Sequence, residues 1–98
     1  MTVKYGLLAL LEAKPGRADE LASFLEQGAV MAGEEPRTIT WYSFKLSDTT
    51  YGVFDTFNDE ESRQAHLSGP IAAALGGIAP DLLASDPNIR PIAIVATK

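Results

Sequence analysis

Two strand-like segments near the middle of the chain constrain its fold more than any other feature. Residues 40–46 and 51–57 are rich in β-branched and aromatic side chains, and the small polar residues 47–50 separate them. This pattern predicts a β-hairpin. The Asn-Asp-Glu-Glu run at 58–61 follows at once, with a capping side chain and acids for the positive end of a helix, so a helix is expected there. That helix carries the only histidine, His66.

The predicted pairing of the hairpin assigns its side chains to two faces. A two-residue loop places Tyr42 opposite Asp55 and Trp41 opposite Thr56, and a four-residue loop keeps the same faces. Tyr42 and Asp55 then share one face, whereas Trp41 and Phe54 share the other. Both faces are apolar enough to need cover, since large exposed apolar patches are uncommon on monomers.

The remaining elements follow from hydrophobic periodicity and from the positions of glycine and proline. They are a buried strand over 3–13, a helix from 17 to about 33, a broken helical region over 69–80 and a final strand over 89–97. The order is therefore β-α-β-β-α-β, and all 98 residues are expected to form one domain. This order predicts an α+β, ferredoxin-like fold, with an antiparallel sheet and both helical regions on one side.

The other side of such a sheet would be bare, although its strands are apolar on both faces. A chain of 98 residues buries only a modest fraction of its surface when it folds alone. We therefore expect a second copy to cover the sheet, so that two sheets close into a dimeric α+β barrel. The expected macromolecular partner is the chain itself, as a homodimer.

Composition argues against several classes of function. The net charge of −5 disfavours nucleic acid and anionic membranes as partners. The most apolar run, 6–11, is far shorter than the ~20 residues of a spanning helix, and the N-terminus lacks a leader pattern, so a cytoplasmic location is expected. With no cysteine and one histidine, a metal site is not expected. Without a glycine-rich phosphate motif, neither is a nucleotide or flavin, so no cofactor is expected.

Four short segments resemble the antibiotic biosynthesis monooxygenase domain family of dimeric α+β barrels: 14–17, 41–44, 54–57 and 65–70. The resemblance covers nearly the whole chain. The family includes cofactor-independent oxygenases of anthrones and quinols, haem-degrading enzymes and members without assigned activity. The haem-degrading branch relies on an asparagine in the first strand, where this chain has Lys4, Tyr5 and Gly6, so that branch is disfavoured.

The resemblance maps the family's helical histidine onto His66 and its acidic strand position onto Asp55. The family often has glutamate there, followed by a basic residue, and Asp55 with Thr56 departs from both features. His66 is the first choice for a catalytic base, because only histidine titrates near neutrality unperturbed. The alternative is a structural or solvated histidine. Asp55 could likewise form a catalytic dyad, or a structural pair with the hydroxyl of Tyr42.

Aromatic side chains near these groups could wall a pocket for a flat ligand, or they could simply be core or interface residues. The expected substrate-binding residues are Trp41, Tyr42, Phe54 and Asp55. The resemblance implies oxidation of an electron-rich aromatic substrate, such as a quinol, an anthrone or a related polyketide, by dioxygen without a cofactor. A non-catalytic binder of a small hydrophobic molecule and a purely structural dimerisation module are the alternatives.

Overall fold

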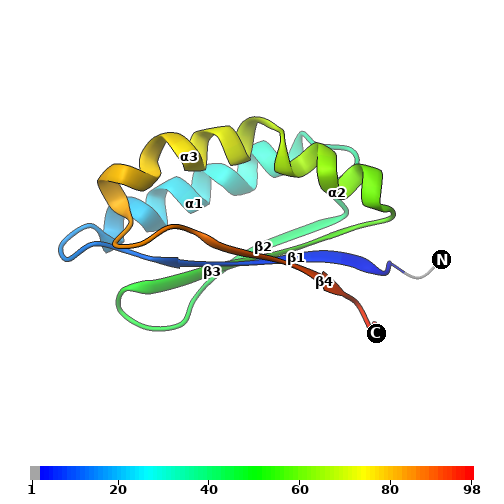
Figure 1. Cartoon of the computed structure of the whole chain (residues 1–98), viewed down its shortest axis with the longest axis horizontal. Coiled ribbons are helices and arrows are strands. Elements are labelled where there is room, and N and C mark those ends of the chain that lie inside the picture. Colours follow the sequence, from blue (N-terminus) through cyan, green and yellow to red (C-terminus); the bar gives the residue numbers. More distant parts are fainter. Residues whose placement is uncertain (1–2) are drawn as a thin grey trace.

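One antiparallel sheet carries three helices on one of its faces in the computed structural model, which describes residues 3–98 (Figure 1). In chain order the elements are β1 (Tyr5–Glu12), α1 (Ala18–Gly33), β2 (Thr40–Lys45), β3 (Thr50–Phe57), α2 (Glu60–Leu67), α3 (Pro70–Leu82) and β4 (Asn88–Ala93). The strand order is β2-β3-β1-β4. The predicted α+β, ferredoxin-like topology is confirmed.

Strand β1 lies in the interior of the sheet and pairs antiparallel with both β3 and β4. Leu7 is opposite Asp55 on one side and opposite Pro91 on the other. Because side chains alternate along a strand, Leu7 and Leu11 point toward the helices, whereas Leu8 points to the opposite face. Leu7 is 4% exposed and Leu11 1% exposed, so this strand supplies much of the core.

The hairpin has a different register from the predicted one. Trp41 is opposite Asp55, and Tyr42 is opposite Phe54. The backbone N–H of Leu46 donates to the carbonyl of Thr50, which leaves three residues in the loop and not two or four. An odd loop shifts the pairing by one residue, and a shift of one moves every side chain of a strand to the other face.

The helices begin and end where capping and proline allow. Asp59, which belongs to the predicted capping run at 58–61, caps α2 by accepting a hydrogen bond from the Ser62 N–H at 2.7 Å. The predicted break in the third helix is wrong, because α3 is continuous from Pro70 to Leu82. Pro70 occupies the first turn, where its missing N–H is not needed, and Pro80 falls in the last turn.

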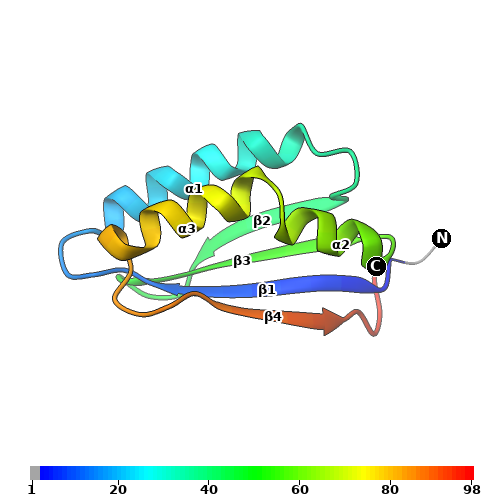
Figure 2. The ribbon, with the colours of Figure 1, turned by 45° about the horizontal axis from the view of Figure 1, so that its top comes forward.

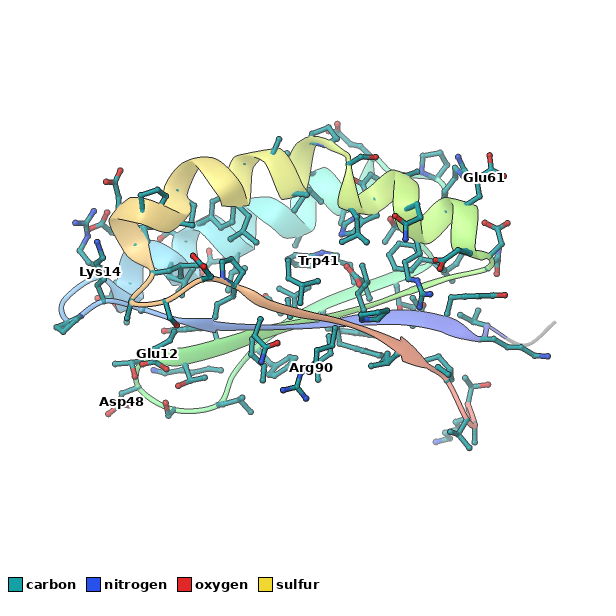
Figure 3. The ribbon with its side chains drawn as sticks, viewed as in Figure 1. Glu12, Lys14, Trp41, Asp48, Glu61 and Arg90 are labelled. Carbon is teal, nitrogen blue, oxygen red and sulfur yellow. The ribbon has the colours of Figure 1, made fainter. Side chains whose placement is uncertain are left out.

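The two faces of the sheet differ in what covers them. Buried residues between the sheet and the helices form the core, among them Leu21 and Phe57 at 0% exposure. In the described part of the chain, no helix lies on the opposite face (Figure 1), and the turned view shows the helices on the near side of the sheet (Figure 2). Tyr42 is 61% exposed there, and the labelled side chain of Arg90 projects from the same side of the sheet (Figure 3).

None of the helices formed by residues 3–98 has both the length and the apolar character needed to cross a membrane.

Candidate functional site

A cavity of about 60 Å³ lies between the sheet and the helices. Its walls come from β1, β2, β3, β4, α1, α2 and α3, and among the described residues the lining is apolar apart from the indole of Trp41 and the side chains of Asp55 and His66. A buried water needs roughly 10–15 Å³ of such space, so the cavity has room for a few waters or a small ligand group. An apolar cavity with a few convergent polar groups is typical of a small-molecule site.

His66 lies between two carboxylates that come from distant parts of the sequence. Its Nε2 is 3.0 Å from Oδ2 of Asp55 on β3, and its Nδ1 is 2.8 Å from Oε1 of Glu35, which follows α1. The side chains of His66 and Asp55 are 8% and 3% exposed, and that of Glu35 is 21% exposed. The ring of Phe57 packs against the imidazole with 5.4 Å between ring centroids. The three polar side chains form one continuous chain of hydrogen bonds.

The two carboxylates determine the protonation state of His66. Ionised carboxylates only accept hydrogen bonds, so this geometry favours a ring that carries N–H donors at both nitrogens, which is an imidazolium. Burial by itself lowers the pKa of His66, but the hydrogen bonds to Asp55 and then to Glu35, with the charges of both carboxylates, more than offset it. The net result is a pKa raised above the ordinary value of 6.5.

An imidazolium with both nitrogens engaged has no lone pair with which to accept a proton. The free acceptor of the cluster is Oδ1 of Asp55, which is buried and has no hydrogen-bond partner among residues 3–98. Asp55 lines the cavity. The unpartnered acceptor of the cluster is therefore a carboxylate oxygen of Asp55, whereas the sequence led us to expect His66 as the proton acceptor.

Trp41 supplies the second unsatisfied group of the cavity. It lies directly opposite Asp55 across the hairpin, and its Nε1 is buried without a hydrogen-bond partner in the described structure. The absence of a side chain at Gly28 lets α1 approach the indole closely, since a Cβ there would be only 3.2 Å from the ring. A buried N–H donor without a partner is costly, so a ligand that accepts from it would be favoured.

Tyr42 and Phe54 do not belong to this cavity. They form a cross-strand pair on the face of the sheet that carries no helix, because the hairpin register differs by one residue from the predicted one. The expected pairing of Tyr42 with Asp55 is therefore wrong, and His66 occupies the position of its partner. Of the four predicted substrate-binding residues, the structure brings Trp41 and Asp55 together with His66 and places Tyr42 and Phe54 elsewhere.

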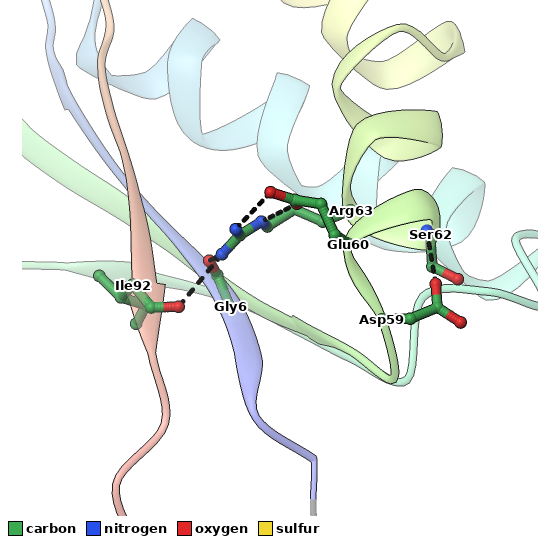
Figure 4. A network of polar contacts seen from close by, with 6 residues as sticks. All are labelled: Gly6, Asp59, Glu60, Ser62, Arg63 and Ile92. Atoms are coloured by element: carbon green, nitrogen blue, oxygen red, sulfur yellow. Dashed lines mark hydrogen bonds and ion pairs between the residues drawn. The ribbon is translucent and has the colours of Figure 1, made fainter.

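Arg63 fixes the helix that carries His66 to the sheet. Its Nη1 donates to the carbonyls of Gly6 on β1 and Ile92 on β4, both at 3.2 Å, and its Nε and Nη2 donate to Glu60 (Figure 4). The Asp59 cap lies at the same end of α2, where the close-up shows it beside this network. One guanidinium thus ties α2 to two neighbouring strands, which restricts the position of His66 one turn further on.

Sequence reasoning does not reveal Glu35. It lies between α1 and β2, where Gly33 and Pro36 indicate only that a helix ends. Its contact with His66 spans 31 residues of sequence, and its Oε1 also accepts a hydrogen bond from Thr38 at 2.8 Å. The nearest available signal is the lone histidine, whose burial next to Asp55 would call for a second acceptor.

The fold and the cavity define a class: an α+β protein of ferredoxin-like topology whose apolar cavity contains a carboxylate–imidazole–carboxylate chain. No family model and no curated protein matches the sequence. The chain belongs to the same family as NE2512 of Nitrosomonas europaea, a protein of unknown function, with 47% identity over 98% of this chain and 93% of that one and a TM-score of 0.95.

Two more distant structures share the fold. A protein of Chloroflexus aurantiacus named "putative antibiotic biosynthesis monooxygenase" is 22% identical, with a TM-score of 0.74 over 97% of this chain and 96% of that one. A Nitrosomonas europaea protein of the same name is 10% identical, with a TM-score of 0.83 over 97% and 94%. At these identities the likeness concerns the fold alone.

Proposed function

We propose that this protein is a cofactor-independent oxygenase of a small electron-rich aromatic substrate of the quinol, anthrone or polyketide type. The observation that carries the proposal is the buried, unpartnered Oδ1 of Asp55, a residue that lines an apolar cavity and whose other carboxylate oxygen is held by His66. A carboxylate in such a place can take a proton from a ligand that displaces water. The names of the two distant structural neighbours agree with this reaction class.

The reaction needs only dioxygen as a second reactant. For an anthrone-type substrate, Asp55 removes a proton from the activated carbon or its phenolic tautomer, and the resulting anion is electron-rich enough to reduce dioxygen. A new C–O bond forms, and the resulting peroxide anion takes the proton from Asp55 to become a hydroperoxide. The remaining hydrogen on that carbon then leaves as a proton while the O–O bond breaks, so one oxygen atom stays in the product as a carbonyl and the other leaves as water.

Three side chains have distinct roles in this scheme. Asp55 is the catalytic residue, because it takes the proton from the substrate in this scheme, whereas His66 is a positioning residue that orients the carboxylate. Trp41 donates its free indole N–H to the oxygen on which negative charge develops. The apolar walls exclude water, which would otherwise compete for the anion.

The size of the cavity bears on the choice of substrate. About 60 Å³ is well below the roughly 300 Å³ at the lower end of pockets for drug-sized ligands. A single-ring quinol is therefore the first substrate to test. A three-ring substrate is too large for this volume. A non-catalytic binding role is the second candidate, favoured by this small volume and by an imidazolium that has no free lone pair.

Aerobic oxidation of a panel of hydroquinones and anthrones tests the proposal, with oxygen uptake and product formation as the measurements. We expect Asp55→Asn to lower kcat by about 10²-fold or more, because the amide keeps the shape of the side chain but cannot accept the proton. Asp48→Asn is the matched control, since Asp48 is exposed in the hairpin turn far from the cavity (Figure 3). Saturable binding without oxygen uptake would instead establish the binder. If the protein shows neither binding nor turnover, the purely structural dimerisation module is the remaining alternative.

We also propose that the protein acts as a homodimer whose two sheets face each other. The helix-free face carries apolar side chains from all four strands: Leu8, Leu10, Tyr42, Phe44, Phe54 and Ile92. The ring of Phe44 lies over Gly52, where an added Cβ would clash with it, so these two residues pack closely on this face of the hairpin. Contiguous apolar surface of this kind is typical of protein interfaces.

Charges placed on this face should separate the dimer. We expect the double substitution Leu10→Arg and Tyr42→Arg to convert a dimer into a monomer, because unpaired charges facing each other would have to be desolvated. Sedimentation velocity gives the mass of each species directly. Val30→Arg is the control, since Val30 is 68% exposed on α1, in the helical layer, and should leave the dimer intact. A native chain that sediments as a monomer would refute the proposal.

A further inference from the structure

The hydrogen-bond chain through His66 runs from the cavity to the surface of the molecule. At its inner end, Asp55 lines the cavity and is 3% exposed. At its outer end, Glu35 is 21% exposed and lines two hollows on the surface, but it does not line the cavity. His66 belongs to the linings of both the cavity and one of these hollows. The imidazole is therefore the connection between a water-poor interior and the solvent.

The surroundings of Glu35 leave it free to exchange protons. Its Oε1 accepts from Thr38 at 2.8 Å as well as from His66, and no ion pair joins it to an arginine or lysine among residues 3–98. The nearby Arg37 instead donates to Ser62 at 3.1 Å and approaches Glu61 at 3.6 Å. Glu34 lines the same hollow and is exposed. The titratable groups that face His66 are thus Asp55 from β3 and Glu35 from the segment after α1.

We propose that Glu35 is the solvent-side terminus of a proton relay, Asp55–His66–Glu35, that compensates charge whenever Asp55 takes up or returns a proton in the cavity. The use of the relay during turnover rests on the oxygenase function proposed above, but the exchange of protons through it does not. At rest, the three side chains of the relay are two carboxylates and one imidazolium, and their net charge is −1.

The protons balance at each step. When Asp55 Oδ1 takes a proton from the substrate, the aspartate becomes neutral and the imidazolium loses the carboxylate that stabilises its charge. The Nδ1 proton of His66 then passes to Oε1 of Glu35 across 2.8 Å and leaves to water. One proton has entered the relay from the cavity and one has left it to the solvent, so the net charge of the three side chains stays at −1. When Asp55 returns its proton, Glu35 takes one from water and passes it back to Nδ1.

Nuclear magnetic resonance of the single histidine tests the relay without a substrate. In protein labelled with ¹⁵N on the imidazole, transfer of saturation from water measures how fast the His66 N–H protons exchange. Below the pKa of His66, we expect Glu35→Gln to slow exchange at Nδ1 by about 10²-fold, the low end of what a general base contributes. A pH titration of the labelled His66 signals should show a lower pKa of His66 in Glu35→Gln, because the amide lacks the charge of the carboxylate.

Two further variants separate the relay from a structural role. Glu34→Gln removes an equivalent charge from the adjacent position and should leave the exchange rate unchanged. Thr38→Val removes the second hydrogen bond to Glu35 but keeps the carboxylate, so exchange should stay fast. Unchanged or faster exchange in Glu35→Gln, or equal slowing in Glu34→Gln, would overturn the relay.

If turnover is found, loss of activity in Asp55→Asn with normal exchange in Glu35→Gln would refute the relay alone. Glu35-dependent exchange without any turnover would refute the oxygenase alone.

Discussion

Replacing His66 by alanine is expected to lower the free energy of unfolding by about 3–5 kcal/mol, because removing one partner of a buried ion pair leaves the other uncompensated. Asp55 is the residue left behind: its side chain is 3% exposed, and the only hydrogen bond to its carboxylate from the described residues comes from His66. Unfolding in urea near pH 6, followed by circular dichroism, measures the loss. A cost below 1 kcal/mol would show that water already solvates Asp55.

The double variant His66→Ala with Asp55→Asn is the control for this explanation. A neutral amide costs less to bury without a partner than a carboxylate does, so the second substitution should recover part of the stability that the first removes. A double variant that is less stable than His66→Ala alone would indicate that packing, and not charge, explains the loss. A double-mutant cycle, made of the native chain, the two single variants and the double variant, gives the coupling free energy between His66 and Asp55.

The pH dependence of the same difference tests the charge on the ring. The folded-state pKa of His66 is raised above 6.5, so the stabilisation from the imidazolium is fully present below pH 6.5 and is lost as pH rises through the folded-state pKa. The difference in stability between the native chain and His66→Ala should therefore shrink as pH rises through that window. A difference that grows with pH would contradict the imidazolium.

Local sequence patterns predict most of the architecture, because they report local physics. Alternation in the hairpin, acids and a cap at 58–61, and the proline at position 70 identify elements that the structure contains. The strands are shorter than expected, at Tyr5–Glu12 and Asn88–Ala93, since pairing partners limit them and hydrophobicity alone does not. The continuity of α3 also depends on tertiary contacts, which override the weak helix preference of two glycines.

The sequence identifies individual residues of the site but not which side chains contact them. Asp55 and His66 are conspicuous in the sequence, one as an acid among aromatics and the other as the sole histidine, but their partners depend on geometry. The length of one loop, three residues and not two, decides whether Tyr42 or Trp41 shares a face with Asp55. Glu35 reaches His66 only because the segment after α1 folds against α2, and no local pattern encodes that contact.

Truncation of Phe57 to alanine is expected to cost about 3–5 kcal/mol, as for other fully buried phenylalanines, because the missing ring leaves a void that close-packed neighbours cannot fill. Phe57 is 0% exposed, and its ring packs against the imidazole of His66 at 5.4 Å between centroids. Urea unfolding measures the loss. Water that enters the void should also reach His66 and the carboxylates beside it. The pKa of His66 in this variant should therefore differ from its value in the native chain.

Phe54→Ala is the matched control, because the two phenylalanines belong to the same strand but point to opposite faces of the sheet. Phe54 is only partly buried, so its truncation should cost the protomer about 1–2 kcal/mol and leave the pKa of His66 unchanged. If the sheets of two copies face each other, its effect should appear as weaker dimerisation in sedimentation velocity. Equal losses of protomer stability in the two variants would mean that the helix-free face is packed as tightly as the core, which contradicts the two-faced sheet described here.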